Sequence, residues 1–302
     1  MHDALLLLPD FLLIVCGFVI CRFTPLNRPV WDGAERLVYF LLFPTLLFTS
    51  ILRYPLSPVA MLPLAGSSVA VVAIGIVLAF ALRRAPGVDA RLHASGAQTA
   101  FRFNSYVALA LSERIAGTQG VAWMALIVSL CVPLCNVAAV WPLARQGGQG
   151  FAGQLLRNPL IVSTGAGLLC NALGIRLPDI ASATLGRIGS AALPIGLMAV
   201  GAGLQVGALR EAPVLAGALL LIRHALLPLA AIAMVLALAL PPAQQAVVVA
   251  FAAMPTASSA YVLAVRMGGH GAYVAGLVTV STLIGMVGLP LALLALAALR
   301  GG

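Results

Sequence analysis

Residues 253–261 read AMPTASSAY and interrupt an apolar stretch, residues 243–266, that is long enough to cross a membrane. A spanning helix needs about 20 predominantly apolar residues. Pro255 lacks an amide hydrogen and its ring clashes with the preceding turn, so we expect the helix to break here. The hydroxyl groups beside the break either satisfy the backbone groups that it releases or simply pack the helix. They belong to Thr256, Ser258 and Ser259.

The composition of the whole chain is that of a membrane protein. Of its 302 residues, 62% are hydrophobic and only 8% are charged. A soluble domain carries about 25% charged residues, and with so few charges it would not cover its surface. Lipid must therefore form a large part of the solvent around this chain.

Apolar runs separated by Arg, Pro and Gly predict ten spanning helices. They cover residues 4–21, 35–52, 59–82, 94–113, 120–142, 158–175, 184–206, 213–240, 243–266 and 271–298. No cleavage site follows the first run, so we expect it to be retained as a span. A hydrophilic gap between Arg145 and Arg157 divides the chain almost in half, into residues 1–150 and 151–302.

Positive charge predicts the orientation of these spans. The 17 basic residues are all Arg, and more of them lie in the loops after odd-numbered spans than on the opposite side. The positive-inside rule then places these loops in the cytoplasm and both termini outside. Anionic lipid headgroups account for the net charge of +9, so no nucleic-acid partner is expected. The sequence predicts a multi-pass protein of a bacterial inner membrane.

The two halves of the chain repeat each other weakly. Pro9, Gly17 and Pro44 match Pro159, Gly167 and Pro194, each 150 positions further on. With five spans in each half, the second half would be inverted in the membrane. Inverted repeats are typical of secondary transporters, whose binding sites lie near the membrane midplane on broken helices.

The fourth predicted span, residues 94–113, holds Gln98, Arg102, Asn104 and Ser105 at membrane depth. A guanidinium or carboxamide there costs several kcal/mol unless it is paired or hydrated. Arg102 offers a carboxylate a charged, two-pronged donor, or else it has a structural role at a break. We assign Asn104 and Ser105 to the presumed site, and Gln98 either to its support or to the interface. Half-helix N-termini at two breaks would add free amides, which suit a carboxylate.

Three further residues are candidates for support or coupling, namely Thr45, Asp10 and His224. Asp10 is either an N-terminal cap or a proton site. His224 either carries a proton or is a satisfied structural group. The adjacent Arg223 either extends toward the membrane surface or neutralises a buried acid. The five cysteines lack metal-site spacing, so the sequence predicts no metal and no cofactor.

Two motifs carry a resemblance to a known family. They read Gln98-x-x-x-Arg102-x-Asn104-x-x-Val107 and Met254-Pro255-Thr256-Ala257-x-x-Ala260-Tyr261-Val262-Leu263-Ala264. Residues 43–48, FPTLLF, and the last span are also similar. On these motifs the chain resembles the auxin efflux carrier family of bacterial and plant permeases over essentially its whole length.

The resemblance implies an all-α fold of ten transmembrane helices in two inverted five-helix repeats. The fourth and ninth spans would be broken and cross, as in related bile-acid symporters and sodium–proton antiporters. Spans 1, 2, 6 and 7 would form a scaffold, through which relatives form homodimers, and spans 3–5 and 8–10 a transport domain. Asn104 and Pro255 match the crossing asparagine and proline of the family, whereas the proline that plant relatives carry in the fourth span is missing here.

These observations predict a secondary transporter that moves a small organic anion by alternating access. The resemblance implies a carboxylate such as malate, malonate or the auxin indole-acetic acid, with coupling to a proton or sodium gradient left open. The alternatives are a bile-acid-type symporter of related fold and, less favoured, an anion channel. An enzyme is not expected, because the four His residues are scattered and no nucleophile motif is present.

Overall fold

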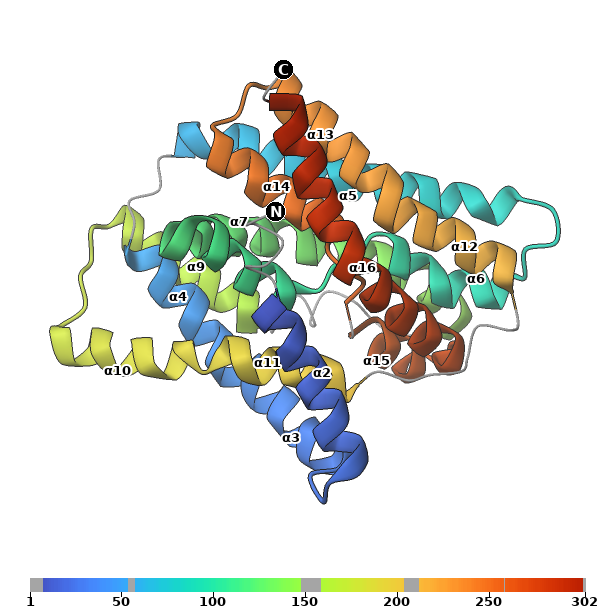
Figure 1. The fold of residues 1–302 in the computed structure, drawn as a ribbon, viewed down its shortest axis with the longest axis horizontal. Helices are drawn as coiled ribbons and strands as arrows, with labels where there is room; N and C mark the ends of the chain where they lie inside the picture. The colour runs from blue at the N-terminus through green and yellow to red at the C-terminus, as the bar shows by residue number, and fades with distance from the viewer. Residues whose placement is uncertain (1–7, 54–57, 148–158, 204–211, 258, 301–302) are drawn as a thin grey trace. The chain divides into compact units, whose positions relative to one another are not determined.

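The computed structural model describes residues 8–53, 58–147, 159–203, 212–257 and 259–300 (Figure 1). These residues form helices and no strands, which confirms the predicted all-α class over this part of the chain. The α-helices are α2 (Leu8–Phe23), α3 (Arg28–Leu37), α4 (Phe43–Arg53), α5 (Pro58–Ala81), α6 (Ala90–Gly96), α7 (Ser105–Gly147), α9 (Pro159–Ala172), α10 (Asp179–Ser190), α11 (Ala192–Ala202), α12 (Pro213–Leu221), α13 (Leu227–Ala237), α14 (Pro242–Ala253), α15 (Ser259–Arg266) and α16 (Gly271–Arg300). Short 3-10 segments are η2 (Leu82–Arg84) and η3 (Ala97–Ala100), and π-helical segments are η1 (Val38–Leu42) and η4 (Ile222–Leu226).

Within the described residues, five helical stretches are long and apolar enough to cross a membrane. They are Met61–Arg84, Ala90–Leu143, Asp179–Ala202, Pro213–Ala237 and Gly271–Arg300, and shorter apolar helices cover Leu12–Phe23 and Pro242–Ala253. The chain is therefore a polytopic helical protein by length and composition. The count of ten spans and the inverted repeat stay predictions. Part of the predicted hydrophilic gap, residues 148–158, lies outside the described residues.

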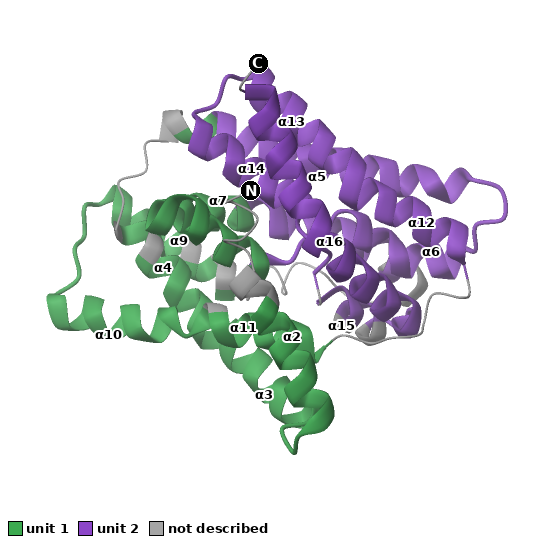
Figure 2. Cartoon of the chain, in the orientation of Figure 1, with its two compact units in different colours: residues 1–62, 106–129, 152–203 green, residues 63–105, 130–151, 204–302 purple. Residues whose placement is uncertain are grey.

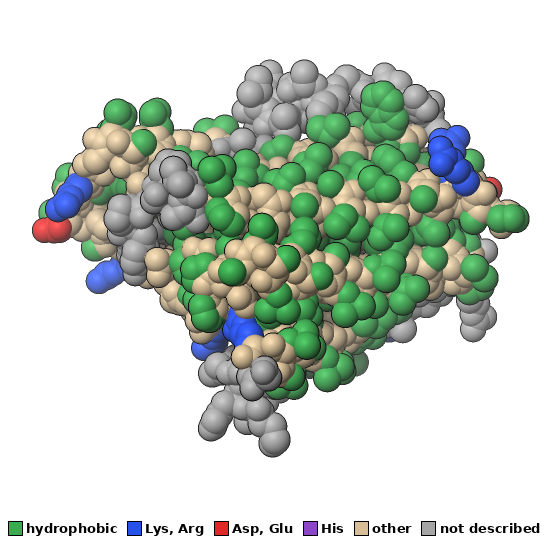
Figure 3. Space-filling view, turned by 90° about the horizontal axis from the view of Figure 1, so that it is seen from above, with side chains coloured by type: hydrophobic (Ala, Val, Ile, Leu, Met, Phe, Trp, Pro, Cys, Tyr) green, Lys and Arg blue, Asp and Glu red, His purple; other side chains and the backbone are tan. Residues whose placement is uncertain are grey.

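The surface of these helices suits a hydrocarbon solvent. Hydrophobic side chains are spread across the face shown in Figure 3, where few charged side chains are seen. Large apolar side chains that would be buried in a soluble protein are strongly exposed, among them Phe23 (73%), Ile180 (84%) and Val214 (86%). An exposed apolar surface of this kind marks contact with lipid or with another apolar partner.

The long stretch Ala90–Leu143 contains both the fourth and the fifth predicted spans. Helix α7 runs from Ser105 to Gly147, but Ala116 and Gly117 leave the helical conformation. Gly117 has φ +57°, a left-handed conformation that glycine adopts without steric cost. This kink separates two helices between the predicted spans 94–113 and 120–142, where the sequence predicts a connection.

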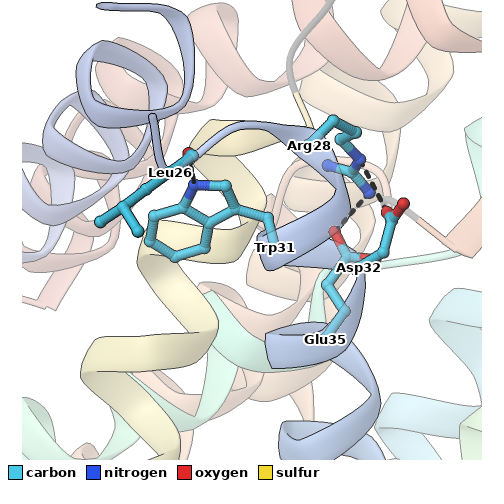
Figure 4. A network of polar contacts seen from close by, with 5 residues as sticks. All are labelled: Leu26, Arg28, Trp31, Asp32 and Glu35. Carbon is cyan, nitrogen blue, oxygen red and sulfur yellow. Dashed lines mark hydrogen bonds and ion pairs between the residues drawn. The ribbon is translucent and has the colours of Figure 1, made fainter. Parts of the chain in front are cut away.

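The helical segment that holds the second predicted span begins earlier than predicted. Helix α3 begins at Arg28, seven residues before the expected start at residue 35, because Pro29 occupies its first turn, where a missing amide costs nothing. Arg28 then bonds Asp32 at 2.9 Å and Glu35 at 2.8 Å (Figure 4). The Trp31 indole donates to the Leu26 carbonyl at 2.9 Å, so a polar network closes the turn between α2 and α3.

The chain divides into two compact units, each of which draws on both halves of the sequence (Figure 2). Unit 1 contains Met1–Leu62, Tyr106–Ser129 and Ala152–Gly203. Unit 2 contains Pro63–Ser105, Leu130–Phe151 and Leu204–Gly302. The predicted domain boundaries, at residue 150 between the repeats and between scaffold and transport domain, stay predictions.

In unit 1, helices pack closely where they present glycine. Helix α2 packs against α11, and α9 packs against α4. A Cβ atom at Gly17 would overlap the backbone of Met198, and one at Gly201 would overlap the backbone of Ile14. Small residues let helix backbones approach in this way in membranes, where dispersion contacts hold helices together. Gly17 and Gly201 are therefore required for the contact between α2 and α11.

Candidate functional site

The fourth predicted span is broken without a proline. Segment η3 ends at Ala100, residues 101–104 are non-helical, and α7 begins at Ser105. The backbone amides of Phe101 and Arg102 both donate to the Gln98 carbonyl, at 3.3 and 2.9 Å. The Asn104 amide then leaves the helical pattern and donates to the carbonyl of Pro255 at 2.8 Å. A long-range hydrogen bond thus takes the place that a proline would have in opening this helix.

The ninth predicted span is broken at Pro255, as its sequence predicts. Helix α14 ends at Ala253, Met254 is extended with φ −58° and ψ 144°, and α15 begins at Ser259. The Thr256 amide donates to the Ser281 hydroxyl of α16 at 2.8 Å, so a side chain satisfies a backbone group released by the break. Ser258, a predicted site residue, lies outside the described residues.

Both breaks lie within unit 2 and are bonded directly to each other. Besides the bond from Asn104 to Pro255, the Thr256 hydroxyl donates to the Thr99 carbonyl at 2.6 Å. The Gln98 carboxamide donates to the carbonyls of Ser95 at 3.1 Å and Ala260 at 3.2 Å. The structure therefore brings most of the predicted site residues together around one point, and Gln98 supports it from within instead of lying at the interface.

Arg102 reaches from one break to the other. Its Nη2 donates to the Ser259 hydroxyl at 2.9 Å, at the first residue of α15. Arg102 is 9% exposed and Asn104 is 3% exposed, whereas Ser259 lies on the surface. Ser105, which begins α7, is half-buried. The arrangement places a guanidinium and a hydroxyl beside the N-terminal ends of two half-helices, which are favourable positions for an anion.

Arg223 contributes a second buried guanidinium. It lies on η4, is 1% exposed, and donates to the carbonyls of Met254 at 2.7 Å, Ala252 at 2.7 Å and Phe251 at 3.2 Å. Its burial contradicts the expected extension toward the membrane surface, and its hydrogen-bond partners among the described residues are backbone carbonyls in place of the expected buried acid. It caps the end of α14, and the only cue in the sequence is a charged residue inside an apolar run.

A chain of hydrogen bonds links His224 to the same break. The Ser281 hydroxyl donates to the Thr256 hydroxyl at 3.1 Å and accepts the Thr256 amide. The same hydroxyl lies 2.8 Å from His224 Nε2, and the tautomer of the imidazole sets which of the two groups donates. His224 is thus tied to the break through Ser281, a residue that the sequence did not single out as part of the site.

Two predicted residues lie in the other compact unit, unit 1. Thr45 lies on α4 in unit 1, where its hydroxyl donates to the Leu41 carbonyl one helical turn earlier at 2.7 Å. Asp10 lies on α2, also in unit 1, and its side chain lies outside the described part of the structure.

The buried charge around the breaks is positive. Among the described residues, Arg102 and Arg223 are buried, while every acidic side chain is at least partly exposed. Buried charges are costly unless they are hydrogen-bonded or paired, and here three backbone carbonyls bond Arg223 and the Ser259 hydroxyl bonds Arg102.

Comparison with known families adds one finding. The model of a family described as Membrane transport protein matches residues 149–293. This range includes Arg223, the break at Pro255 and Ser281, whereas residues 98–104 precede it. No curated protein matches the chain.

Proposed function

Since the chain belongs, through residues 149–293, to the membrane transport protein family, which is the auxin efflux carrier family, we propose that it is a secondary transporter for a small organic anion. The anion binds where the two broken helices meet and is released on the other side of the membrane by alternating access. The proposed substrates are carboxylates such as malate, malonate or an auxin-like acid. The candidate energy sources are a proton gradient and a sodium gradient, between which the next proposal chooses, and the proposed location is a bacterial inner membrane.

The observation that carries this proposal is the pairing of the two breaks. The bonds from Asn104 to Pro255 and from Thr256 to Thr99 hold two non-helical segments together inside a buried, apolar unit. Irregular backbone at membrane depth is tolerated where it is buried in protein or lines a water-filled cavity. In secondary transporters such backbone, with its half-helix ends, forms the substrate site.

The charge of the site supports an anion as the substrate. The Arg102 guanidinium presents several N–H donors in one plane, and a carboxylate has two oxygens to accept them. Ser259 already accepts one of these donors at the start of α15. A carboxylate that bridges Arg102 and the start of α15 would combine a full charge with the partial positive charge of a helix N-terminus.

A binding measurement with Arg102 variants tests this assignment. Malonate, succinate, malate, lactate and indole-acetate are added to the purified protein, each beside its neutral amide, and the thermal stability is recorded. We expect at least one acid to stabilise the protein and its amide not to do so. Arg102→Gln should weaken that binding by roughly 10- to 100-fold, because a charged hydrogen bond is lost. Arg102→Lys should weaken acid binding less than Arg102→Gln does, because the positive charge remains.

Arg187→Ala is the matched control, since Arg187 is an exposed arginine on α10. Unchanged acid binding by a folded Arg102→Gln protein would remove Arg102 from the site. If Arg102→Gln and Arg102→Lys both fail to fold, Arg102 is structural. Stabilisation by the amides instead of the acids would contradict an anion site.

A further inference from the structure

The guanidinium of Arg223, on η4, lies against the end of α14 at the break of the ninth predicted span. We propose that Arg223 is a resident cation that fills the cation-binding end of this broken helix, so that no sodium ion binds there.

The groups that Arg223 contacts are backbone carbonyls at the end of a helix. The last carbonyls of a helix have no intrahelical amide partner and carry partial negative charge. In α14 the chain breaks at Pro255, and the carbonyls of Phe251, Ala252 and Met254 all accept from Arg223 at 2.7–3.2 Å. Its hydrogen-bond partners among the described residues are backbone carbonyls, and no described acid is buried beside it.

The same oxygens are suited to a sodium ion. Half-helix C-terminal ends and unwound carbonyls coordinate the coupling ion in secondary transporters with broken helices. Here one fixed positive charge already takes three of these oxygens. Arginine does not lose its proton in proteins. A sodium ion would therefore meet both occupied ligands and strong repulsion from a charge a few ångströms away in a medium of low dielectric constant.

The segment that carries Arg223 is held in place on both sides. Arg223 lies in η4, a π-helical segment, and such segments occur frequently at functional sites. The next residue, His224, bonds Ser281 at 2.8 Å, and Ser281 in turn bonds Thr256 at the break. The guanidinium is thus positioned by the same network that closes the break.

The proposal that Arg223 is a resident cation does not depend on the proposed function. Its consequence for ion coupling does rest on the proposed function. If the protein is a carrier, its cycle does not take up sodium at this end of the site, and a proton gradient or the gradient of the anion itself drives transport.

The test uses purified protein in detergent, with sodium ion and guanidinium ion as probes. Thermal unfolding is measured in sodium chloride, guanidinium chloride and choline chloride at equal ionic strength, far below denaturing concentrations. The wild-type protein should show the same Tm in all three. Arg223→Ala should have a lower Tm in choline, and guanidinium ion should raise it by about 3 °C, with a smaller rise in sodium. Arg223→Lys keeps a cation, so its Tm should be close to that of the wild type and should not depend on sodium. The control Arg187→Ala should behave in the same way.

Two results would overturn the proposal. One is a sodium-dependent Tm in the wild-type protein. The other is a folded Arg223→Ala protein that responds to neither ion. Should Arg223→Ala yield no folded protein, the neutral variant Arg223→Met is used in its place. Wild-type stability of Arg223→Met would refute a resident cation. Recovery of its fold with added guanidinium would support a resident cation. No transported acid enters this experiment, so its failure and a failure of the proposed transport function are separate results.

Discussion

Asn104→Ala is expected to lower carboxylate transport by about 100-fold, the equivalent of about 3 kcal/mol for a buried polar group, while the protein still folds. The break itself should survive, because the bond from residue 104 to Pro255 is made by the backbone amide, which alanine keeps. Only the carboxamide, on a residue that is 3% exposed beside Arg102, is removed. Initial rates of labelled malonate uptake into proteoliposomes measure the loss, and size-exclusion chromatography shows whether the variant is folded.

Ser190→Ala is the control for this variant, because it removes an exposed hydroxyl that bonds only its own helix, to the Arg187 carbonyl at 2.8 Å. Its uptake should equal that of the wild type. Normal uptake by folded Asn104→Ala protein would show that the crossing asparagine does not contribute to transport. Loss of the folded monodisperse peak would show that the carboxamide is needed for the fold.

Gly201→Ala is expected to have the largest effect on stability. A Cβ at this position would overlap the backbone of Ile14, which has no flexible end that can move aside. Helices α2 and α11 would have to separate, and overpacking of this kind costs about 3 kcal/mol. We expect the Tm of the purified protein to fall by about 5–10 °C, or the yield of folded protein to collapse.

The control for this variant is Gly165→Ala on α9, where a Cβ would meet no atom within 4 Å. It should leave the Tm unchanged or raise it slightly, since alanine restricts the unfolded chain more than glycine does. Equal Tm values for the two variants would mean that α2 and α11 do not approach each other as closely as the structure places them.

Local chemistry explains why some features could be predicted from the sequence. Proline lacks an amide donor and clashes with the preceding turn, so a break at Pro255 could be expected at the end of α14, although Pro63 and Pro290 lie inside continuous helices. Arg102 and Asn104 stand out because polar groups at membrane depth are expensive. The all-α class follows from a composition that leaves lipid as the solvent and requires every backbone group to be bonded within its own segment.

Long-range contacts explain what could not be predicted. The break at residues 101–104 has no proline, and its hydrogen bond reaches Pro255, about half the chain away. The partners of Arg223 lie 28 to 31 residues further on, and no local pattern in the sequence shows which carbonyls it will meet. Ser281 is similar: its hydroxyl matters because α16 passes beside the break, which depends on packing.

The measurement that tests the central claim most directly is the charge displaced by transport in proteoliposomes adsorbed on a solid-supported membrane. A concentration jump of malonate, malate, succinate, lactate or indole-acetate starts each measurement. The experiment is repeated with and without a proton gradient, and with sodium replaced by choline. The account predicts a saturable current for at least one carboxylate that is lost in Asn104→Ala and does not depend on sodium. No current and no counterflow for any of these acids, from wild-type protein that is folded and inserted, would contradict an organic-anion carrier with its site at the two breaks.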